Sequence, residues 1–282
     1  MSTARPSWRW LLPVIALVAL GAVTIAFAIV QLNHDNTADS APEPSPPTTP
    51  SQAPAADSPA TGTDPSTSPS TSPSAGASPD ASAIPIASRV DPSWVASMAT
   101  ATGIPERALA AYAGATLAEQ EKAPNCGLGW NTLAAIGQVE SQHGSLHKAT
   151  LAEDGSVKPR IIGPALDGGK FGRIRDTDHG KLDHDRTWDH AVGPMQFLPQ
   201  SWKKWAADGD LDGTRDIDQI DDAALAAADY LCADNRNLAD SGTWQRAIGT
   251  YNAGIEYAAQ VATTANQYAA AASAASGTSA TP

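Results

Sequence analysis

The sequence predicts a mainly α-helical domain that carries one long loop or small β-hairpin insert. Apolar residues recur at helical spacing in five Ala- and Leu-rich segments. Runs in which Val, Ile and Thr alternate with polar residues, as they do in half-buried strands, are scarce. The exception to the helical pattern is an irregular insert at residues 144–191, and a structureless stretch of that length is usually functional. The expected helices are residues 105–121, 130–142, 200–207, 221–232 and 244–270.

The first feature along the chain is an uncharged apolar run at residues 11–30, preceded by Arg5 and Arg9. A helix of that length spans roughly 30 Å of hydrocarbon. The next basic residue is Arg89, so the positive flank lies on the N-terminal side of the run. We therefore expect a transmembrane anchor at residues 11–32.

The same charge bias predicts the orientation of this anchor. Cytoplasmic flanks carry the excess of Lys and Arg, so residues 1–10 should stay in the cytoplasm and the rest of the chain should lie outside. This predicts a single-pass protein of the cell membrane. The alternative is a cleaved signal peptide, because Ala26-Phe27-Ala28 fits a small-x-small cleavage site. Both interpretations export the folded domain.

A disordered linker is predicted at residues 33–84. Eleven of the 22 prolines fall between Pro42 and Pro79, in a stretch without a bulky apolar residue. Such a segment cannot bury enough surface to offset its ordering entropy. Proline favours extended geometry and six acidic residues repel one another, so the linker should space a folded domain at residues 85–270 from the membrane. Residues 271–282, which are mostly small, are expected to form a flexible tail.

The exported part of the chain is acidic. Residues 85–282 carry 24 acidic and 16 basic side chains, a net charge of −8. Binding to nucleic acid depends on a basic surface that releases counterions from phosphates. Nucleic acid is therefore excluded as a partner, and an anionic lipid surface is disfavoured for the same reason.

The chain has two cysteines, Cys126 and Cys232, and both follow the apolar run. The predicted topology places them in an oxidising compartment, where a disulfide between them is the natural pairing. Such a bridge would contribute about 3 to 5 kcal/mol in the chain-entropy model. Two buried free thiols are the alternative.

Glu140 is the candidate catalytic group. Leu133, Ile136, Gly137 and Glu140 follow helical spacing, so on a helix Glu140 shares the apolar face and points inward. Burial disfavours its charged form, and so does a position near the negative end of the helix dipole, where Gly144 can end the helix. Both effects raise the pKa of Glu140, as a proton donor at neutral pH requires. The alternative is a surface glutamate at a frayed helix end.

Five short segments form a combination that is specific to one family. They are Glu140-Ser141 after an Ala-rich helix, Ile162-Gly163-Pro164-Ala165-Leu166-Asp167-Gly168, Gly193-Pro194-Met195-Gln196-Phe197-Leu198-Pro199, Ser201-Trp202, and Asp222-Ala223-Ala224 leading to Tyr230-Leu231-Cys232. Over residues 88–265 the chain resembles bacterial lytic murein transglycosylases, most closely the membrane-bound lytic transglycosylase B type. The resemblance implies a lysozyme-like, mainly α-helical fold.

The resemblance also assigns residues to a sugar-binding cleft. It implies that Glu140 is the catalytic acid and that Ser141 supports it. Gln196 and Phe197 match residues that line the cleft, and Met195 packs beside them. These four residues that accompany Glu140 are therefore expected to bind or position substrate.

A second group of expected substrate-binding residues includes Tyr251 and Asn252, which match an aromatic and amide pair that faces the acid. Thr187 stands where the family places a cleft hydroxyl. The family often shows Tyr-Asn-x-Ser-x-x-Tyr, and here Gly254 replaces the Ser while Tyr257 remains. The sequence Tyr-Asn-Ala-Gly instead resembles the soluble branch of the family, so the contact made by that Ser is in doubt.

The implied reaction is cleavage of the β-1,4 bond between N-acetylmuramic acid and N-acetylglucosamine in peptidoglycan, leaving 1,6-anhydromuramyl ends. One glutamate suffices for this chemistry, with no cofactor, and we expect a monomeric catalytic domain facing the cell wall. A hydrolytic muramidase is the first alternative, and it would need a second carboxylate such as Asp167 or Asp183. A non-catalytic module that binds the cell wall is the second alternative.

Two further patterns suggest metals. Asp208, Asp210 and Asp212 form the first half of a calcium loop, but its twelfth position is Gln219, which cannot bind bidentately as Glu does. A hydrogen-bonded turn is the alternative to calcium there. Five histidines lack ligand spacing and are expected to be exposed in loops without a metal: His143, His147, His179, His184 and His190.

Overall fold

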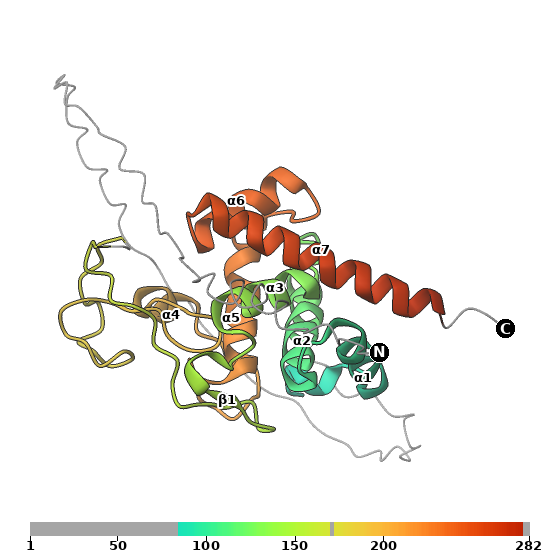
Figure 1. Cartoon of the computed structure of the whole chain (residues 1–282), viewed down its shortest axis with the longest axis horizontal. Coiled ribbons are helices and arrows are strands. Elements are labelled where there is room, and N and C mark those ends of the chain that lie inside the picture. The colour runs from blue at the N-terminus through green and yellow to red at the C-terminus, as the bar shows by residue number, and fades with distance from the viewer. Residues whose placement is uncertain (1–83, 170–171, 279–282) are drawn as a thin grey trace, which may run out of the picture. The chain divides into compact units, whose positions relative to one another are not determined.

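Helices make up most of the chain that the computed structural model describes, residues 84–169 and 172–278 (Figure 1). The prediction of a mainly α-helical domain is confirmed for this part. The predicted anchor at residues 11–32, and all but the last residue of the predicted linker, lie outside the described residues. Within the described ranges, no helix combines the length and the apolar character needed to cross a membrane.

The helices are interrupted by one small hairpin. In chain order they are η2 (Ile86–Arg89), α1 (Pro92–Thr102), α2 (Glu106–Lys122), α3 (Trp130–Ser141), η3 (Leu146–Lys148), α4 (Pro199–Trp205), α5 (Ile220–Cys232), η4 (Ala233–Asn235), α6 (Ser241–Tyr251) and α7 (Ile255–Thr278). The antiparallel strands β1 (Thr150–Leu151) and β2 (Val157–Lys158) lie inside the irregular insert, as one form of the prediction had it. Helix α2 packs against η2, α3 and α5, and α7 lies across α3 (Figure 1).

Helix α1 is not predicted by the spacing of its apolar residues, although the sequence contains the residues that begin and end it. The Asp91 side chain accepts hydrogen bonds from the backbone N–H groups of Ser93 and Trp94, and Pro92 occupies the first turn. Gly103 ends the helix with a φ of 74°. Residues Val95 and Met98 bury one face of α1 in the core. The capping residues therefore locate this helix better than its weak apolar stripe does.

The C-terminal helical segment divides into two helices instead of the single one expected at residues 244–270. Helix α6 ends at Tyr251, and Asn252 adopts an extended conformation with a φ of −149°. The Asn252 side chain accepts a hydrogen bond from Gly254 N–H at 3.0 Å, and asparagine competes with helical backbone bonds in this way. Helix α7 then runs to Thr278, eight residues past the expected domain boundary, because its alanine-rich end favours helix.

A disulfide joins Cys126 to Cys232, with Cα atoms 5.5 Å apart, so the predicted pairing is confirmed. Cys126 lies between α2 and α3, and Cys232 is the last residue of α5. Next to it, the backbone carbonyl of Cys126 accepts a hydrogen bond from Leu238 N–H. The bridge therefore closes the loop that contains α3, the hairpin and α4.

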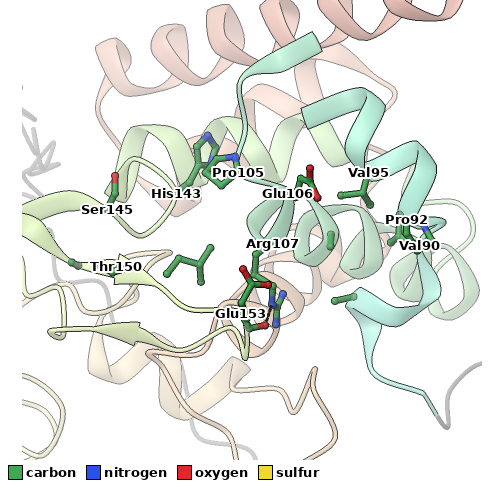
Figure 2. Close-up of a pocket in the computed structure, with 14 residues that line it drawn as sticks. Val90, Pro92, Val95, Pro105, Glu106, Arg107, His143, Ser145, Thr150 and Glu153 are labelled. Atoms are coloured by element: carbon green, nitrogen blue, oxygen red, sulfur yellow. Dashed lines mark hydrogen bonds between the residues drawn. The ribbon is translucent and has the colours of Figure 1, made fainter. Parts of the chain in front are cut away.

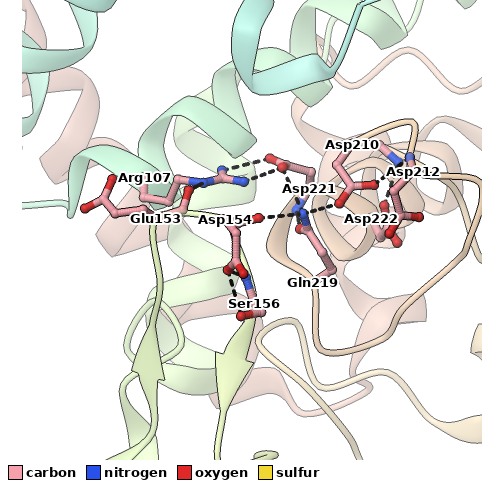
Figure 3. A network of polar contacts seen from close by, with 10 residues as sticks. Arg107, Glu153, Asp154, Ser156, Asp210, Asp212, Gln219, Asp221 and Asp222 are labelled. Carbon is pink, nitrogen blue, oxygen red and sulfur yellow. Dashed lines mark hydrogen bonds and ion pairs between the residues drawn. The ribbon is translucent and has the colours of Figure 1, made fainter.

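A polar network holds the hairpin to the start of α5 (Figure 3). Arg107 on α2 makes a bidentate ion pair with Asp221, and its Nε donates to the backbone carbonyl of Glu153 at 3.0 Å. Gln219 donates to the Asp154 carbonyl at 3.1 Å and to the Asp210 carboxylate at 2.6 Å. Because Asp221 is almost fully buried, this pairing removes the cost of an uncompensated charge there.

Candidate functional site

Glu140 lies in the last turn of α3 and points inward, as its helical spacing predicts. It is 9% exposed and shares its face with the fully buried Leu133 and Ile136. Burial raises the pKa of Glu140 to about 7. At neutral pH a large fraction of this carboxyl therefore carries a proton that it can donate. Its catalytic role remains a prediction.

The end of α3 next to Glu140 has an unusual backbone. Gln142 and His143 have φ angles of 53° and 57°, in the left-handed region, and Gly144 follows with 82°. The backbone N–H of His143 reaches the Gly137 carbonyl at 3.0 Å, which closes the helix end in the way a C-terminal glycine usually does. Backbone in this region costs free energy for residues with a Cβ, and such residues cluster at functional sites.

Glu140 opens into a cavity of about 390 Å³. Its lining is largely uncharged and includes four glutamine amides and one threonine hydroxyl. The lining residues are Gln138, Val139, Glu140, Ser141, Gln142, Leu146, His147, Gly163, Pro164, Gln196, Gln260 and Thr264. Glu140 is the one carboxylic acid in this set of described residues. Amides and hydroxyls around a single proton donor suit a neutral ligand rich in hydroxyl and carbonyl groups.

A tight turn at residues 192–197 supplies Gln196 to the cavity. Val192 and Phe197 exchange two backbone hydrogen bonds, at 2.9 and 3.0 Å, which close the turn. Gly193 has a φ of 79°, and a Cβ there would come 2.1 Å from the Ile217 carbonyl oxygen. Gln196 has a φ of 50°, and its Nε2 donates to the Gly193 carbonyl at 2.9 Å. The turn therefore fixes the Gln196 amide at the cavity.

Ser141 connects this turn to the helix that carries the acid. Its hydroxyl donates to the Pro194 carbonyl at 2.6 Å and accepts from Gly144 N–H at 2.8 Å. Ser141 is 1% exposed, so its hydroxyl is committed to these contacts. Ser141 can therefore support Glu140 by holding the end of α3 against the turn, whereas its hydroxyl is not free to bind a ligand.

Two tyrosines from the C-terminal helices face Glu140. The Tyr257 hydroxyl on α7 is directed at Glu140 and lowers its pKa by favouring the charged carboxylate, and it makes no hydrogen bond elsewhere in the described part of the chain. The Tyr251 hydroxyl donates to the Met195 carbonyl at 2.7 Å. Burial, followed by the charge of Glu140, raises the pKa of both tyrosines well above the usual value. Both hydroxyls therefore stay protonated around the acid.

A smaller cavity of about 100 Å³ lies next to the first one, and Gln196 lines both. Its other lining residues are Phe197, Leu198, Ser201, Tyr230, Thr250 and Tyr251. The rings of Phe197 and Tyr251 meet edge to face, with centroids 5.7 Å apart, and Tyr230 contacts Tyr251 at 5.5 Å. These contacts hold an aromatic wall beside the Gln196 amide.

The structure brings most of the predicted site residues together. Glu140, Ser141 and Gln196 line the larger of these two cavities, and Phe197 and Tyr251 line the smaller one. Met195, Asn252 and Tyr257 are buried beneath them. Thr187 is exposed in the insert and lines neither cavity. Its backbone N–H donates a hydrogen bond to the Asp185 carboxylate at 2.7 Å. The substrate-binding role of each residue remains a prediction.

Three amides of the cavity were missed from the sequence. Gln138 and Gln142 lie one helical turn apart at the end of α3, and Gln260 lies on α7. Helical spacing from Tyr257 places Gln260 and Thr264 on the same face of α7, and this spacing was a usable signal. For Gln138 and Gln142 the sequence holds no such signal, because their exposure depends on the turn that packs opposite.

Residues 173–280 match the transglycosylase SLT domain family. The matched range includes the 192–197 turn, Tyr251 and Tyr257, whereas Glu140 and Ser141 precede it. The match supports a lytic transglycosylase or lysozyme-like family, whose enzymes act on peptidoglycan. No curated protein and no solved structure matches the chain.

The acidic loop after α4 is arranged differently from the predicted calcium loop. Asp208 and Asp210 converge within 4.8 Å on Asp222 of α5, and not on Asp212. The Asp212 carboxylate instead accepts a hydrogen bond from the backbone N–H of Thr214 at 2.7 Å. Asp222 is drawn in because it accepts from two backbone N–H groups of the loop. Asp208, Asp210 and Asp222 are thus the residues that would hold a calcium ion.

A second acidic group lies in the insert, where Asp176, Asp178 and Asp189 converge within 4.8 Å. Each of them accepts hydrogen bonds from the backbone of the same loop. Asp189 is fully buried, and burial raises its pKa. These bonds order the loop that precedes the 192–197 turn.

A larger cavity of about 570 Å³ lies elsewhere, between α1, the start of α2 and the hairpin (Figure 2). Its apolar lining includes Val90, Val95 and Leu151. Its charged lining residues are Glu106, Arg107 and Glu153. Glu140 does not line it, and the polar groups that surround the acid are absent from its described lining. The cavity of about 390 Å³ at Glu140 is therefore the candidate active site.

His143 contradicts the expectation that the histidines are exposed. It is 4% exposed and lines the cavity between α1, α2 and the hairpin (Figure 2). Its ring nitrogens lie 3.2 Å from the Tyr112 hydroxyl and 3.0 Å from the Tyr268 hydroxyl. Burial lowers the pKa of His143 to about 4, so the ring is neutral. It carries hydrogen bonds through the core instead of binding solvent.

Proposed function

We propose that this chain is a membrane-tethered lytic transglycosylase. It cleaves the β-1,4 bond between N-acetylmuramic acid and N-acetylglucosamine and forms 1,6-anhydromuramyl ends. The observation that carries this proposal is Glu140, a lone buried carboxyl with a pKa of about 7 in a cavity lined by amides. The match of residues 173–280 to the SLT domain supports peptidoglycan as the substrate.

In the first step Glu140 acts as a general acid. The protonated carboxyl donates its proton to the glycosidic oxygen as the bond from that oxygen to the anomeric carbon breaks. The N-acetylglucosamine unit leaves as the alcohol, and positive charge develops at the muramyl anomeric carbon. Glu140 is now a carboxylate, and the Tyr257 hydroxyl that faces it stabilises this form.

In the second step the same carboxylate acts as a base. It takes the proton from the muramyl C6 hydroxyl while that oxygen bonds to the anomeric carbon, which closes the anhydro ring and restores the acid. The attack is intramolecular, and proximity can supply several kcal/mol of the barrier. A group with a pKa near neutral pH both releases and recovers a proton readily, which suits one residue for both steps.

The hydrolytic alternative requires a second carboxylate at the reacting carbon. Asp167 is exposed, and its Oδ1 accepts from Gly169 N–H at 2.9 Å. Asp183 is buried, and its oxygens accept from the backbone N–H groups of Asp185 and His190. Neither residue lines the Glu140 cavity. The arrangement of the described acids therefore favours the transglycosylase over the muramidase.

The tether completes the proposal. The apolar residues 11–32 would hold the chain in the cell membrane, with the catalytic domain outside and facing the wall. The 282-residue chain expressed in bacteria should sediment with membranes and resist extraction by high salt or alkali, but dissolve in detergent. Recovery of a shortened chain in the soluble exported fraction would instead show a cleaved signal peptide.

Product analysis tests the reaction. The detergent-solubilised chain is incubated with purified peptidoglycan, and the fragments are resolved by mass. Anhydromuramyl ends are expected, each 18 Da lighter than the hydrolysed end because one water is missing. Reducing ends would show a muramidase, and binding without release would show a non-catalytic module. Glu140→Gln should retain the fold and lose about a thousandfold or more of the activity, because an amide cannot transfer the proton.

A further inference from the structure

A hydrogen-bonded chain of side chains crosses the domain and ends at the Glu140 cavity. Tyr112 on α2 passes over Gly137 of α3, where a Cβ would come 2.0 Å from the Tyr112 hydroxyl oxygen. That hydroxyl lies 3.2 Å from Nδ1 of His143, and Nε2 of His143 lies 3.0 Å from the Tyr268 hydroxyl. The Tyr268 hydroxyl lies 3.5 Å from Oε1 of Gln138, which lines the cavity.

Burial of the first member decides the direction of these hydrogen bonds. Tyr112 is fully buried, and its hydroxyl has one hydrogen-bond partner among the residues the structure describes, Nδ1 of His143. A buried hydroxyl proton without an acceptor costs free energy, so Tyr112 donates and Nδ1 accepts. Because the His143 ring is neutral, its one proton is then on Nε2 and is donated to the Tyr268 oxygen.

The last two bonds follow from the same count. Tyr268 accepts from His143 and has its own proton left, which it donates to Oε1 of Gln138. The amide of Gln138 is thereby assigned, with its oxygen toward Tyr268 and its Nε2 directed away from Tyr268. Gln138 is partly exposed at the cavity, two residues before Glu140. Its N–H donors are the groups that remain for a ligand.

We propose that Gln138 is a substrate-binding residue, and that Tyr112, His143 and Tyr268 position its amide so that Nε2 donates to the carbonyl oxygen of an N-acetyl group on the glycan. This inference rests on the proposed function, since it names a contact within the same site. The N-acetyl carbonyl is the strongest neutral acceptor that such a glycan carries. A donor that is held in place by these three side chains selects for that acceptor, because its loss leaves the amide unpaired.

The other residues around Gln138 agree with a neutral ligand. Gln142 follows it by one helical turn, and Gln260 and Thr264 of α7 line the same cavity. Among the described residues that line the cavity, Glu140 and His147 are the only ionisable ones. A charged group on the ligand would therefore find few partners, whereas carbonyl and hydroxyl groups find several.

Binding measurements test the proposal without turnover. The parent is the 282-residue chain in detergent with Glu140→Gln, and the probe is a hexamer of N-acetylglucosamine, followed by titration calorimetry. Gln138→Leu should weaken binding about tenfold, the effect of one lost hydrogen bond. Tyr268→Phe should weaken it about threefold, because the amide is free to rotate. Gln138→Leu with Tyr268→Phe should bind no more weakly than Gln138→Leu alone, since the tyrosine acts through the glutamine.

Two controls separate this role from a structural one. Gln138→Glu keeps an acceptor for Tyr268 and the shape of the side chain but removes the N–H donors, so it should weaken binding as Gln138→Leu does. The de-N-acetylated hexamer should bind the parent and Gln138→Leu equally. In the active chain, Gln138→Leu should raise KM and leave kcat within about twofold, because the bond is made equally in the ground and transition states.

The outcomes are distinguishable from those of the proposed function. Unchanged affinity in Gln138→Leu, additive losses in the double variant, or equal losses with both hexamers would overturn the role of Gln138. An active wild-type chain with such results keeps the proposed function. A wild-type chain that binds the hexamer through Gln138 but releases no fragments would overturn the proposed reaction and keep the contact.

Discussion

At the scale of single residues, the chemistry depends on how burial sets one proton. Glu140 could be located from the sequence, because Leu133 and Ile136 define a helical face that the same helix continues to residue 140. Its partner could not be located in the same way. Whether the Tyr257 hydroxyl faces the acid depends on how α7 crosses α3, and no local pattern contains that crossing.

The first prediction concerns the stability cost of Glu140. Its pKa is about 7 in the folded chain and close to 4.5 when unfolded. Between these values the folded state retains a proton that the unfolded state has lost, so the free energy of unfolding falls as the pH rises. This cost is absent below pH 4.5 and complete above pH 7. Glu140→Gln should therefore gain stability relative to wild type by up to about 3 kcal/mol between pH 4.5 and 8.

Denaturant unfolding of both chains at several pH values measures this difference. Asp154→Asn is a suitable comparison, because Asp154 is exposed and hydrogen bonds lower its pKa. That carboxyl is ionised in both the folded and the unfolded chain above pH 4.5, so the stability difference between wild type and Asp154→Asn should stay constant from pH 4.5 to 8. A stability difference between wild type and Glu140→Gln that stays constant from pH 4.5 to 8 would show that Glu140 is not held protonated.

The second prediction concerns Tyr257. Its hydroxyl lowers the pKa of Glu140, so Tyr257→Phe should raise that pKa further. For wild type, kcat/KM should fall about tenfold per pH unit above pH 7, as the acid loses its proton. In Tyr257→Phe this alkaline decline should begin at a higher pH. A pH profile of peptidoglycan cleavage measures the shift, and a decline that begins at the wild-type pH or below it would contradict the contact.

At the scale of elements, the site depends on junctions between segments. The helix bounds of α2, α3 and α5 could be predicted to within one residue at each end, because their apolar periodicity is local. The break between α6 and α7 could not be seen from periodicity, since apolar residues continue through it. The buried side chain of Asn252 accepts a hydrogen bond from Gly254 N–H at that break.

The third prediction tests the junction between α3 and the 192–197 turn. The Ser141 hydroxyl satisfies the Pro194 carbonyl and Gly144 N–H, and all three groups are buried. Ser141→Ala should therefore cost about 1 to 3 kcal/mol of stability and lower activity, because Gln196 moves with the turn. Ser145→Ala is the matched control. The Ser145 hydroxyl donates to the Gln142 carbonyl at an exposed site and its loss should cost less than about 0.5 kcal/mol.

Thermal and denaturant unfolding measure the two costs, and cleavage of peptidoglycan measures the activity. Equal stability losses in the two variants would show that the buried contact carries no special weight. A stable Ser141→Ala with full activity would show that the turn holds its place without the helix.

At the scale of the whole chain, long-range closure was the least predictable feature. Asp222 replaces Asp212 in the acidic group because the start of α5 lies against the loop. The cavity of about 570 Å³ is formed by α1, the start of α2 and the hairpin together. Both depend on contacts between residues far apart in the chain. The disulfide is the exception, because a chain with two cysteines leaves one pairing to consider.

The fourth prediction concerns that disulfide. It joins residues separated by 106 positions, so in the chain-entropy model it stabilises the fold by about 4 to 5 kcal/mol. Reduction should lower the thermal midpoint by roughly 10 °C or more, given a domain of this size. Cys126→Ser with Cys232→Ser should unfold at the same temperature as the reduced wild type. Neither cysteine lines the Glu140 cavity, so activity well below the transition should persist.

Thiol titration under denaturing conditions, before and after reduction, connects the fold to the export proposal. No free thiol is expected in the chain recovered from the membrane, and two are expected after reduction. The same chain made without residues 1–32 and kept in the reducing cytoplasm should contain two free thiols and unfold like the double serine variant. Free thiols in the membrane-bound chain would contradict both the bridge and the extracytoplasmic location, because an oxidising compartment is what sustains such a bond.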